Sequence, residues 1–80
     1  LITVDCGISN AEEINVLTKH NIDVIVTDHH LGRHPPSQAL SVLNPSMPGS
    51  GFPFPYLSGV GVTLFLLLAL RRHLRDKGFW

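Results

Sequence analysis

Two β-branched runs, separated by an amphipathic segment, lie within the first 27 residues of the chain. Leu1 to Val4 is typical of a buried strand, residues 10–20 of a helix, and Ile22 to Thr27 of a second strand. A strand, a helix and a strand this close together form a βαβ unit, whose two strands are parallel. The pattern therefore predicts an α/β fold with three layers, α/β/α, around a parallel β-sheet.

The remaining residues extend this arrangement without marking a second domain. Leu40 to Leu43 is a third strand candidate, and a proline- and glycine-rich loop follows it. Residues 59–77 have a helical pattern whose first half is apolar all round, which predicts burial on several sides. We find no boundary within residues 1–80. Since the chain opens inside a strand and ends at Trp80, just after a helix stop, we expect it to be part of a longer protein.

Composition gives little indication of a partner. The 80 residues carry a formal net charge of zero, so bulk charge points to neither nucleic acid nor a membrane. The longest apolar run, Val60 to Leu70, would span about 17 Å as a helix, whereas a bilayer core needs about 30 Å. The single cysteine, Cys6, permits no internal disulfide, which fits a cytoplasmic location. We expect its side chain to fill a small buried space.

Polar side chains follow each predicted strand. Asp5 follows the first strand, Asp28 the second and Asn44 the third. Because the carboxyl ends of parallel strands open on one edge of a sheet, we expect Asp5, Asp28, His29 and His30 to share a crevice there. Carboxylate oxygen and imidazole nitrogen suit Mn²⁺, Zn²⁺ or Fe²⁺. The alternative is a surface loop whose histidines merely face water.

The same residues resemble a known family. Val26 to Leu31 contains Asp-His-His and resembles the signature of the DHH phosphoesterase superfamily, while Thr3 to Ser9 resembles the preceding aspartate motif of its RecJ branch. The separation between Asp5 and Asp28 (28 minus 5, or 23 residues) agrees with that branch. Further similar stretches follow in the expected order, at residues 42–45, 57–62 and 68–76. The resemblance thus covers essentially the whole chain.

The resemblance implies an activity and a set of roles. RecJ-type enzymes remove nucleotides from the 5′ ends of single-stranded DNA during DNA repair and recombination, using two metal ions, Mn²⁺ or Mg²⁺. It implies Asp5 and His29 as metal ligands, and His30 as a catalytic residue that faces the scissile phosphate. Asp28 would be catalytic as an outer-shell or weak ligand. A single-strand-binding protein or a helicase would be the expected protein partner.

Half of the metal shell that this family needs is not in the chain. The family has closely spaced aspartates before this segment and a further aspartate after it, and Asp76 comes too early for that position. We therefore expect these residues alone not to cleave DNA. Two other functions stay open: a related phosphoesterase acting on oligonucleotides, cyclic dinucleotides or pyrophosphate, and a non-catalytic RecJ-like scaffold.

Three other features have two interpretations each. Arg33 and His34, just after the triplet, are candidate contacts to a DNA phosphate or part of a solvated loop. Gly59 and Gly61 suggest either a phosphate loop or close packing of a helix start, and no Gly-Lys-Ser/Thr follows them. The basic residues from Arg71 onwards could contact DNA, although cations near a helix C-terminus are favoured by the helix dipole in any case.

Overall fold

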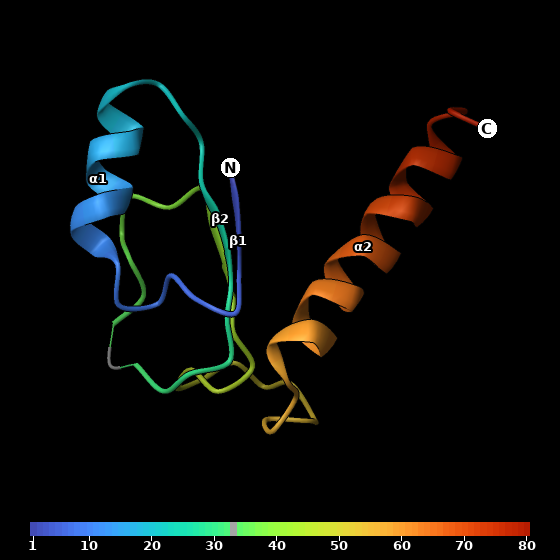
Figure 1. The fold of residues 1–80 in the computed structure, drawn as a ribbon. Helices are drawn as coiled ribbons and strands as arrows, with labels where there is room; N and C mark the ends of the chain where they lie inside the picture. The colour runs from blue at the N-terminus through green and yellow to red at the C-terminus, as the bar shows by residue number, and fades with distance from the viewer. Residues whose placement is uncertain (33) are drawn as a thin grey trace.

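A parallel three-stranded sheet lies between two helices in the computed structural model, which describes residues 1–32 and 34–80 (Figure 1). The strand order is β1-β2-β3, so β2 is central and hydrogen-bonded on both sides. The predicted α/β fold and the parallel βαβ unit are confirmed. The elements are β1 Ile2–Val4, α1 Ala11–Lys19, β2 Ile25–Thr27, β3 Ser41–Leu43 and α2 Gly59–Asp76.

The α1 face of the sheet carries the hydrophobic core. Val24 and Val26 are fully buried and pack with Ile14 of α1, and Leu17 and Val42 complete the contact. Side chains alternate between the two faces of a strand, so the neighbours of Val26 in β2 point the other way. The face of the sheet towards α1 is therefore covered by that helix.

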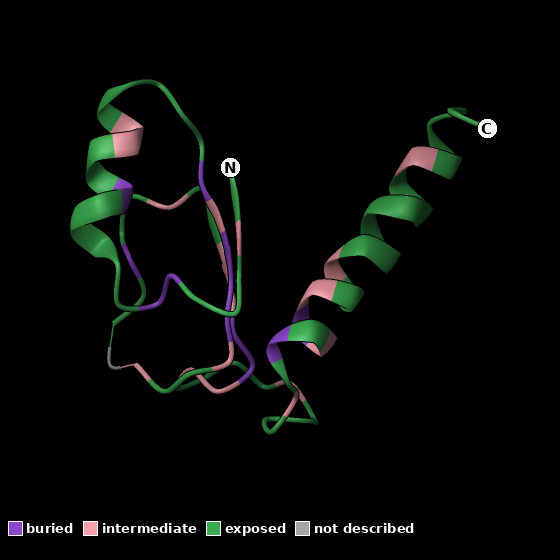
Figure 2. Ribbon diagram, viewed as in Figure 1, coloured by how far each residue is buried: buried purple, intermediate pink, exposed green. Residues whose placement is uncertain are grey.

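The α2 face is covered only at one end. Thr27 Oγ1 lies 3.2 Å from Thr63 Oγ1, and Gly59 and Val62 are the buried residues of α2. Beyond its first turns the helix leans away from the sheet, and its surface is exposed (Figures 1 and 2). The prediction that this helix is buried on several sides is wrong for this chain, because only its N-terminal end reaches the strands.

Two further expectations about burial are corrected. The first strand forms, but Ile2 and Val4 are about half exposed, because they face the side that α2 leaves open. Cys6 is exposed and does not fill a buried space. The turn after β1 passes through positive φ at Asp5 (62°) and Gly7 (113°), and Gly7 and Ile8 are the buried residues. The tight turn at Gly7 therefore points its neighbour's thiol outwards.

Among the described residues, none of the helices is both long and apolar enough to cross a membrane.

Candidate metal centre

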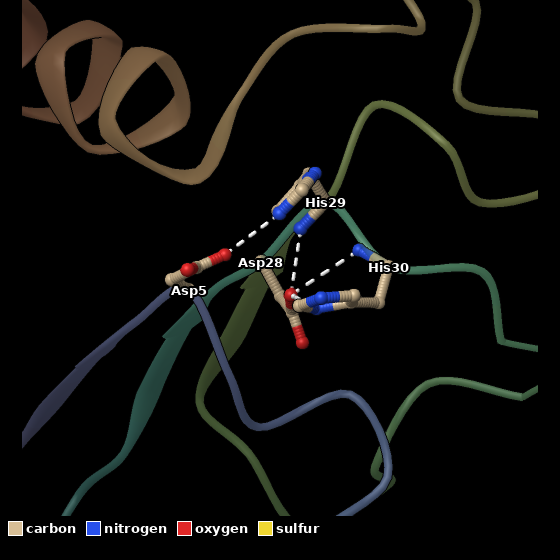
Figure 3. A group of neighbouring side chains, drawn as sticks. All are labelled: Asp5, Asp28, His29 and His30. Atoms are coloured by element: carbon tan, nitrogen blue, oxygen red, sulfur yellow. Dashed lines mark hydrogen bonds and ion pairs between the residues drawn. The ribbon is translucent and has the colours of Figure 1, made fainter.

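Four side chains with metal-binding atoms meet at the carboxyl edge of the sheet. Asp5 comes directly after β1 and Asp28 directly after β2. Their amides continue the sheet ladder, donating to Thr27 O and Leu43 O at 3.0 Å each. One oxygen or nitrogen from each of Asp5, Asp28, His29 and His30 lies within 4.8 Å of the others (Figure 3). The predicted convergence of these residues on one edge is confirmed.

Asp5 and His29 form the accessible half of this cluster. Asp5 Oδ1 lies 2.7 Å from His29 Nε2, and both side chains reach solvent. The Asp5 backbone has φ of 62°, a conformation that aspartate tolerates better than most residues. Because the residue turns sharply out of the strand there, its carboxylate points across the edge towards the second strand.

Asp28 is the buried member of the cluster, and its side chain is 1% exposed. Its Oδ2 accepts a hydrogen bond from the Ile8 amide at 3.0 Å, and its Oδ1 accepts from the amides of His29 (2.7 Å) and His30 (3.2 Å). Burial is the largest single influence on its pKa and raises it. The hydrogen bonds from Ile8, His30 and His29 together outweigh burial and lower the pKa below its ordinary value. Asp28 is thus held ionised and anchors the turn.

The His30 ring is oriented by Asp28. Its Nδ1 lies 2.6 Å from Asp28 Oδ1, and an ionised carboxylate can only accept, so Nδ1 carries the proton. The backbone carbonyl of His30 accepts a hydrogen bond from Asn44 Nδ2 at 2.8 Å, while the Ser46 amide donates to Asn44 Oδ1 at 2.9 Å. The ring is half exposed, and its Nε2 makes no hydrogen bond with the described residues. It is therefore available to a ligand outside the cluster.

The donor set fits a divalent metal ion. Two carboxylates and two imidazoles offer the mixed oxygen and nitrogen ligands that borderline divalent ions accept. Asp5 and His29 could hold the ion, and Asp28 supports the adjoining histidine. Asp76 lies at the opposite end of α2 from this edge, so it does not contribute (Figure 1). Of the two residues proposed to contact DNA from the following loop, His34 is exposed and Arg33 lies outside the described residues.

Two contacts within the site were not predicted from the sequence. The Ile8 amide reaches the buried Asp28 carboxylate from a turn 20 residues away. Gly59, at the start of α2, lies against the side chain of Asp5. Of the two interpretations of the glycine pair, close packing of a helix start against the sheet holds for Gly59, which packs against the residue that follows β1. Gly61 packs against Leu57 of the preceding loop.

The comparison with protein families agrees with this geometry. The DHH family, N-terminal domain, matches residues 1–78 of the 80. The chain belongs to the DHH family. Its similarity to members of the RecJ branch extends over nearly its whole length, and the Asp-His-His triplet that names the family is the turn held by Asp28. The matched range includes all four residues of the cluster described above.

Several relatives of this DHH chain are RecJ proteins. It is 42% identical over all 80 residues to the single-stranded-DNA-specific exonuclease RecJ of Escherichia coli, of which it covers 14%. It is 39% identical over 77 residues, 96% of the chain, to the protein of that name from Bacillus subtilis, of which it covers 10%. To the protein of that name from Thermus thermophilus it is 40% identical over 73 residues, 91% of the chain and 10% of the relative. No solved structure was found to match the chain.

Proposed function

We propose that residues 1–80 are part of the DHH domain of a longer, metal-dependent exonuclease that removes nucleotides from the 5′ ends of single-stranded DNA. The observation that carries this is the cluster of Asp5, Asp28, His29 and His30 at the carboxyl edge of a parallel sheet. The names of the RecJ relatives supply the single-stranded DNA substrate. The 5′ polarity comes from the family resemblance.

Each residue of the cluster has a proposed part in the reaction. Asp5 and His29 would hold a metal ion, since their side chains meet at 2.7 Å and are open to solvent. The ion would activate water and neutralise the phosphate charge. His30 would face the scissile phosphate through Nε2, in the orientation that Asp28 imposes on Nδ1. Because a phosphodiester has only acceptor oxygens, His30 would contact it as an imidazolium that donates from Nε2. Arg33 remains a candidate phosphate contact.

The donor set bears on the choice of metal. Mg²⁺ prefers oxygen ligands and gives up its water reluctantly, whereas imidazole nitrogen suits softer divalent ions. Because His29 would be a nitrogen ligand, we propose Mn²⁺ as the better cofactor and Mg²⁺ as the weaker alternative. Two ions are proposed, with the remaining ligands supplied from outside these residues.

The test uses the full-length protein, Mn²⁺ and 5′-labelled single-stranded DNA. We expect the wild-type protein to release labelled mononucleotide. The rate of release should fall by about 10²-fold or more in Asp5→Ala and in His29→Ala, because each variant removes a proposed metal ligand. His73→Ala and Asp23→Ala are the matched controls. Both side chains are exposed and lie on other parts of the chain, so these variants should keep wild-type rates.

The alternatives give different results in the same assay. Hydrolysis of a cyclic dinucleotide or pyrophosphate, with the DNA left intact, would assign the chain to another DHH branch. Absence of hydrolysis and of Mn²⁺ binding would favour a scaffold. A cytoplasmic location is consistent with a DNA substrate and with the free thiol of Cys6. A single-strand-binding protein or helicase as partner rests on the resemblance alone.

A further inference from the structure

The first residue of α2 lies directly against the Asp5 side chain. A Cβ atom added at Gly59 would lie 2.5 Å from Asp5 Oδ1, 2.7 Å from its Cγ and 2.8 Å from its Cβ. Real Cβ atoms essentially never come within 3.0 Å of another heavy atom in this way. Gly59 is also buried, so no side chain at this position could turn towards solvent without moving something. Any residue larger than glycine must therefore displace either α2 or Asp5.

The backbones on both sides of this contact are held in place. The Asp5 amide donates to Thr27 O at 3.0 Å, inside the sheet ladder. On the helix side, Ser58 Oγ accepts from the Gly61 amide at 3.2 Å and caps the first turn. Thr63 Oγ1 lies 3.0 Å from Gly59 O and 3.2 Å from Thr27 Oγ1, which ties that turn to β2.

The carboxylate of Asp5 is the part that can yield. Its side chain is 59% exposed, so its Cγ and carboxylate oxygens can rotate into solvent. The Asp5 Cβ, at 2.8 Å, does not move in such a rotation, so the backbone must also give by a few tenths of an ångström. A larger shift of the backbone or of the capped helix start would break hydrogen bonds. Rotation would take Asp5 Oδ1 away from His29 Nε2, which it meets at 2.7 Å. The cluster would then lose the pair of atoms that we propose as metal ligands.

We infer that Gly59 is a positioning residue for the metal site. The absence of a side chain there leaves room for the Asp5 carboxylate to face His29, so the start of α2 limits the orientation of a candidate ligand that directly follows β1. This inference rests on the proposed function, because the orientation matters only if Asp5 and His29 bind a metal ion. It assigns Gly59 to the site through Asp5 and gives it no contact with substrate.

Gly61 provides a matched control in the same helical turn. A Cβ atom at Gly61 would be equally crowded, at 2.5 Å from Leu57 Cδ1 and 2.7 Å from its Cγ. Its neighbour is an apolar side chain of the preceding loop and not a member of the cluster. Gly59→Ala and Gly61→Ala therefore make the same chemical change with a similar clash, and they differ in whether a metal ligand is displaced.

The experiment measures Mn²⁺ affinity of the full-length protein by isothermal titration calorimetry. We expect Gly59→Ala to weaken binding by about 10- to 100-fold, the usual effect of disturbing a residue that orients a metal ligand. We expect Gly61→Ala to stay within about twofold of wild type, as for a site that is not coupled to the cluster.

A second background separates positioning from a general loss of structure. Asp5→Gly removes all three atoms that a Cβ at Gly59 would meet, and glycine accepts the φ of 62° at that position. In this background, adding Gly59→Ala should change the residual Mn²⁺ affinity by no more than about twofold, and should not lower the melting temperature. If Gly59→Ala alone fails to fold, restored folding in the double variant would support the same conclusion.

Each other result overturns the inference. If wild type binds Mn²⁺ and Gly59→Ala binds it equally tightly, the positioning role fails while the proposed function stands. If Gly59→Ala weakens binding as much with Asp5→Gly as without it, or the double variant still does not fold, Asp5 is not the residue that Gly59 positions. If wild type binds no Mn²⁺, the proposed function and this inference fail together.

Discussion

Replacement of Asp28 by asparagine should loosen the Asp-His-His turn without changing its size. The carboxylate accepts four hydrogen bonds, one at Oδ2 from the Ile8 amide and three at Oδ1 from the amides of His29 and His30 and from the His30 ring. Asparagine keeps one oxygen but replaces the other with an NH₂ donor. Whichever way the carboxamide is placed, its NH₂ group must face a donor.

The cost can be worked from these contacts. If the asparagine oxygen takes the place of Oδ1, the bond from Ile8 is lost and a buried amide is left without an acceptor. A hydrogen bond to a charged group contributes about 1.5–3 kcal/mol, and the three remaining bonds weaken because the charge is gone. We estimate a loss of about 2–3 kcal/mol in the free energy of local opening. At 1.36 kcal/mol per factor of ten, the opening equilibrium rises roughly 30- to 160-fold.

Hydrogen exchange followed by mass spectrometry can measure the local opening equilibrium in the full-length protein. We expect the segments containing the Ile8 amide and residues 28–30 to exchange faster by that factor in Asp28→Asn. Asp23→Asn is the control, since Asp23 is exposed and its carboxylate makes no hydrogen bond or ion pair with the described residues. Unchanged exchange in Asp28→Asn, or an equal change in Asp23→Asn, would refute the idea that this carboxylate holds the turn.

The same structure makes four further predictions. Because the pKa of Asp28 is lowered on folding, its contribution to stability should be present above about pH 4 and be lost as pH falls through the lower folded pKa. Hydrogen exchange at the Ile8 amide, corrected for the intrinsic rate, should speed up over that pH range in wild type and not in Asp28→Asn. The 80-residue chain alone, loaded with Mn²⁺, should release no more nucleotide than its Asp5→Ala/His29→Ala variant, because we expect part of the metal ligands to lie outside it. A higher rate of release than that of the variant would contradict this expectation. The same chain should self-associate and bind an apolar dye through the exposed surface of α2. A monomer by light scattering that also unfolds cooperatively in calorimetry would count against this. Asn44→Ala should lower kcat more than it raises KM for DNA, because it removes the hydrogen bond to the carbonyl of His30. Gln38 is an exposed residue before β3, so Gln38→Ala should leave both parameters unchanged.

Local patterns were enough to predict the part of the fold that brings the cluster together. Strand and helix periods are properties of neighbouring residues, and a crossover of one helix requires parallel strands. From these rules alone, Asp5 and Asp28 had to lie on one edge of the sheet, and the structure confirms it. The Asp-His-His triplet and its spacing from Asp5 were sufficient to indicate the family, since a signature of this kind is a local string.

The packing of α2 was decided only by the tertiary structure. An apolar helix pattern predicts that something covers the helix, but it does not specify which element does so. Of the residues of α2, only Gly59 and Val62 are buried. The exposed thiol of Cys6 has a similar origin, because the backbone turn at Gly7 sets which side chains face inwards.

The fine geometry of the site also depends on contacts between distant residues. The Ile8 amide meets Asp28 across 20 residues, and Gly59 meets Asp5 across 54 (59 minus 5). No sequence period links such positions, because the intervening loops determine how the elements close on one another. The sequence alone was therefore able to determine which residues gather at the edge of the sheet. The tertiary structure decided how each carboxylate is oriented, since that depends on atoms brought next to it only when the whole chain has folded.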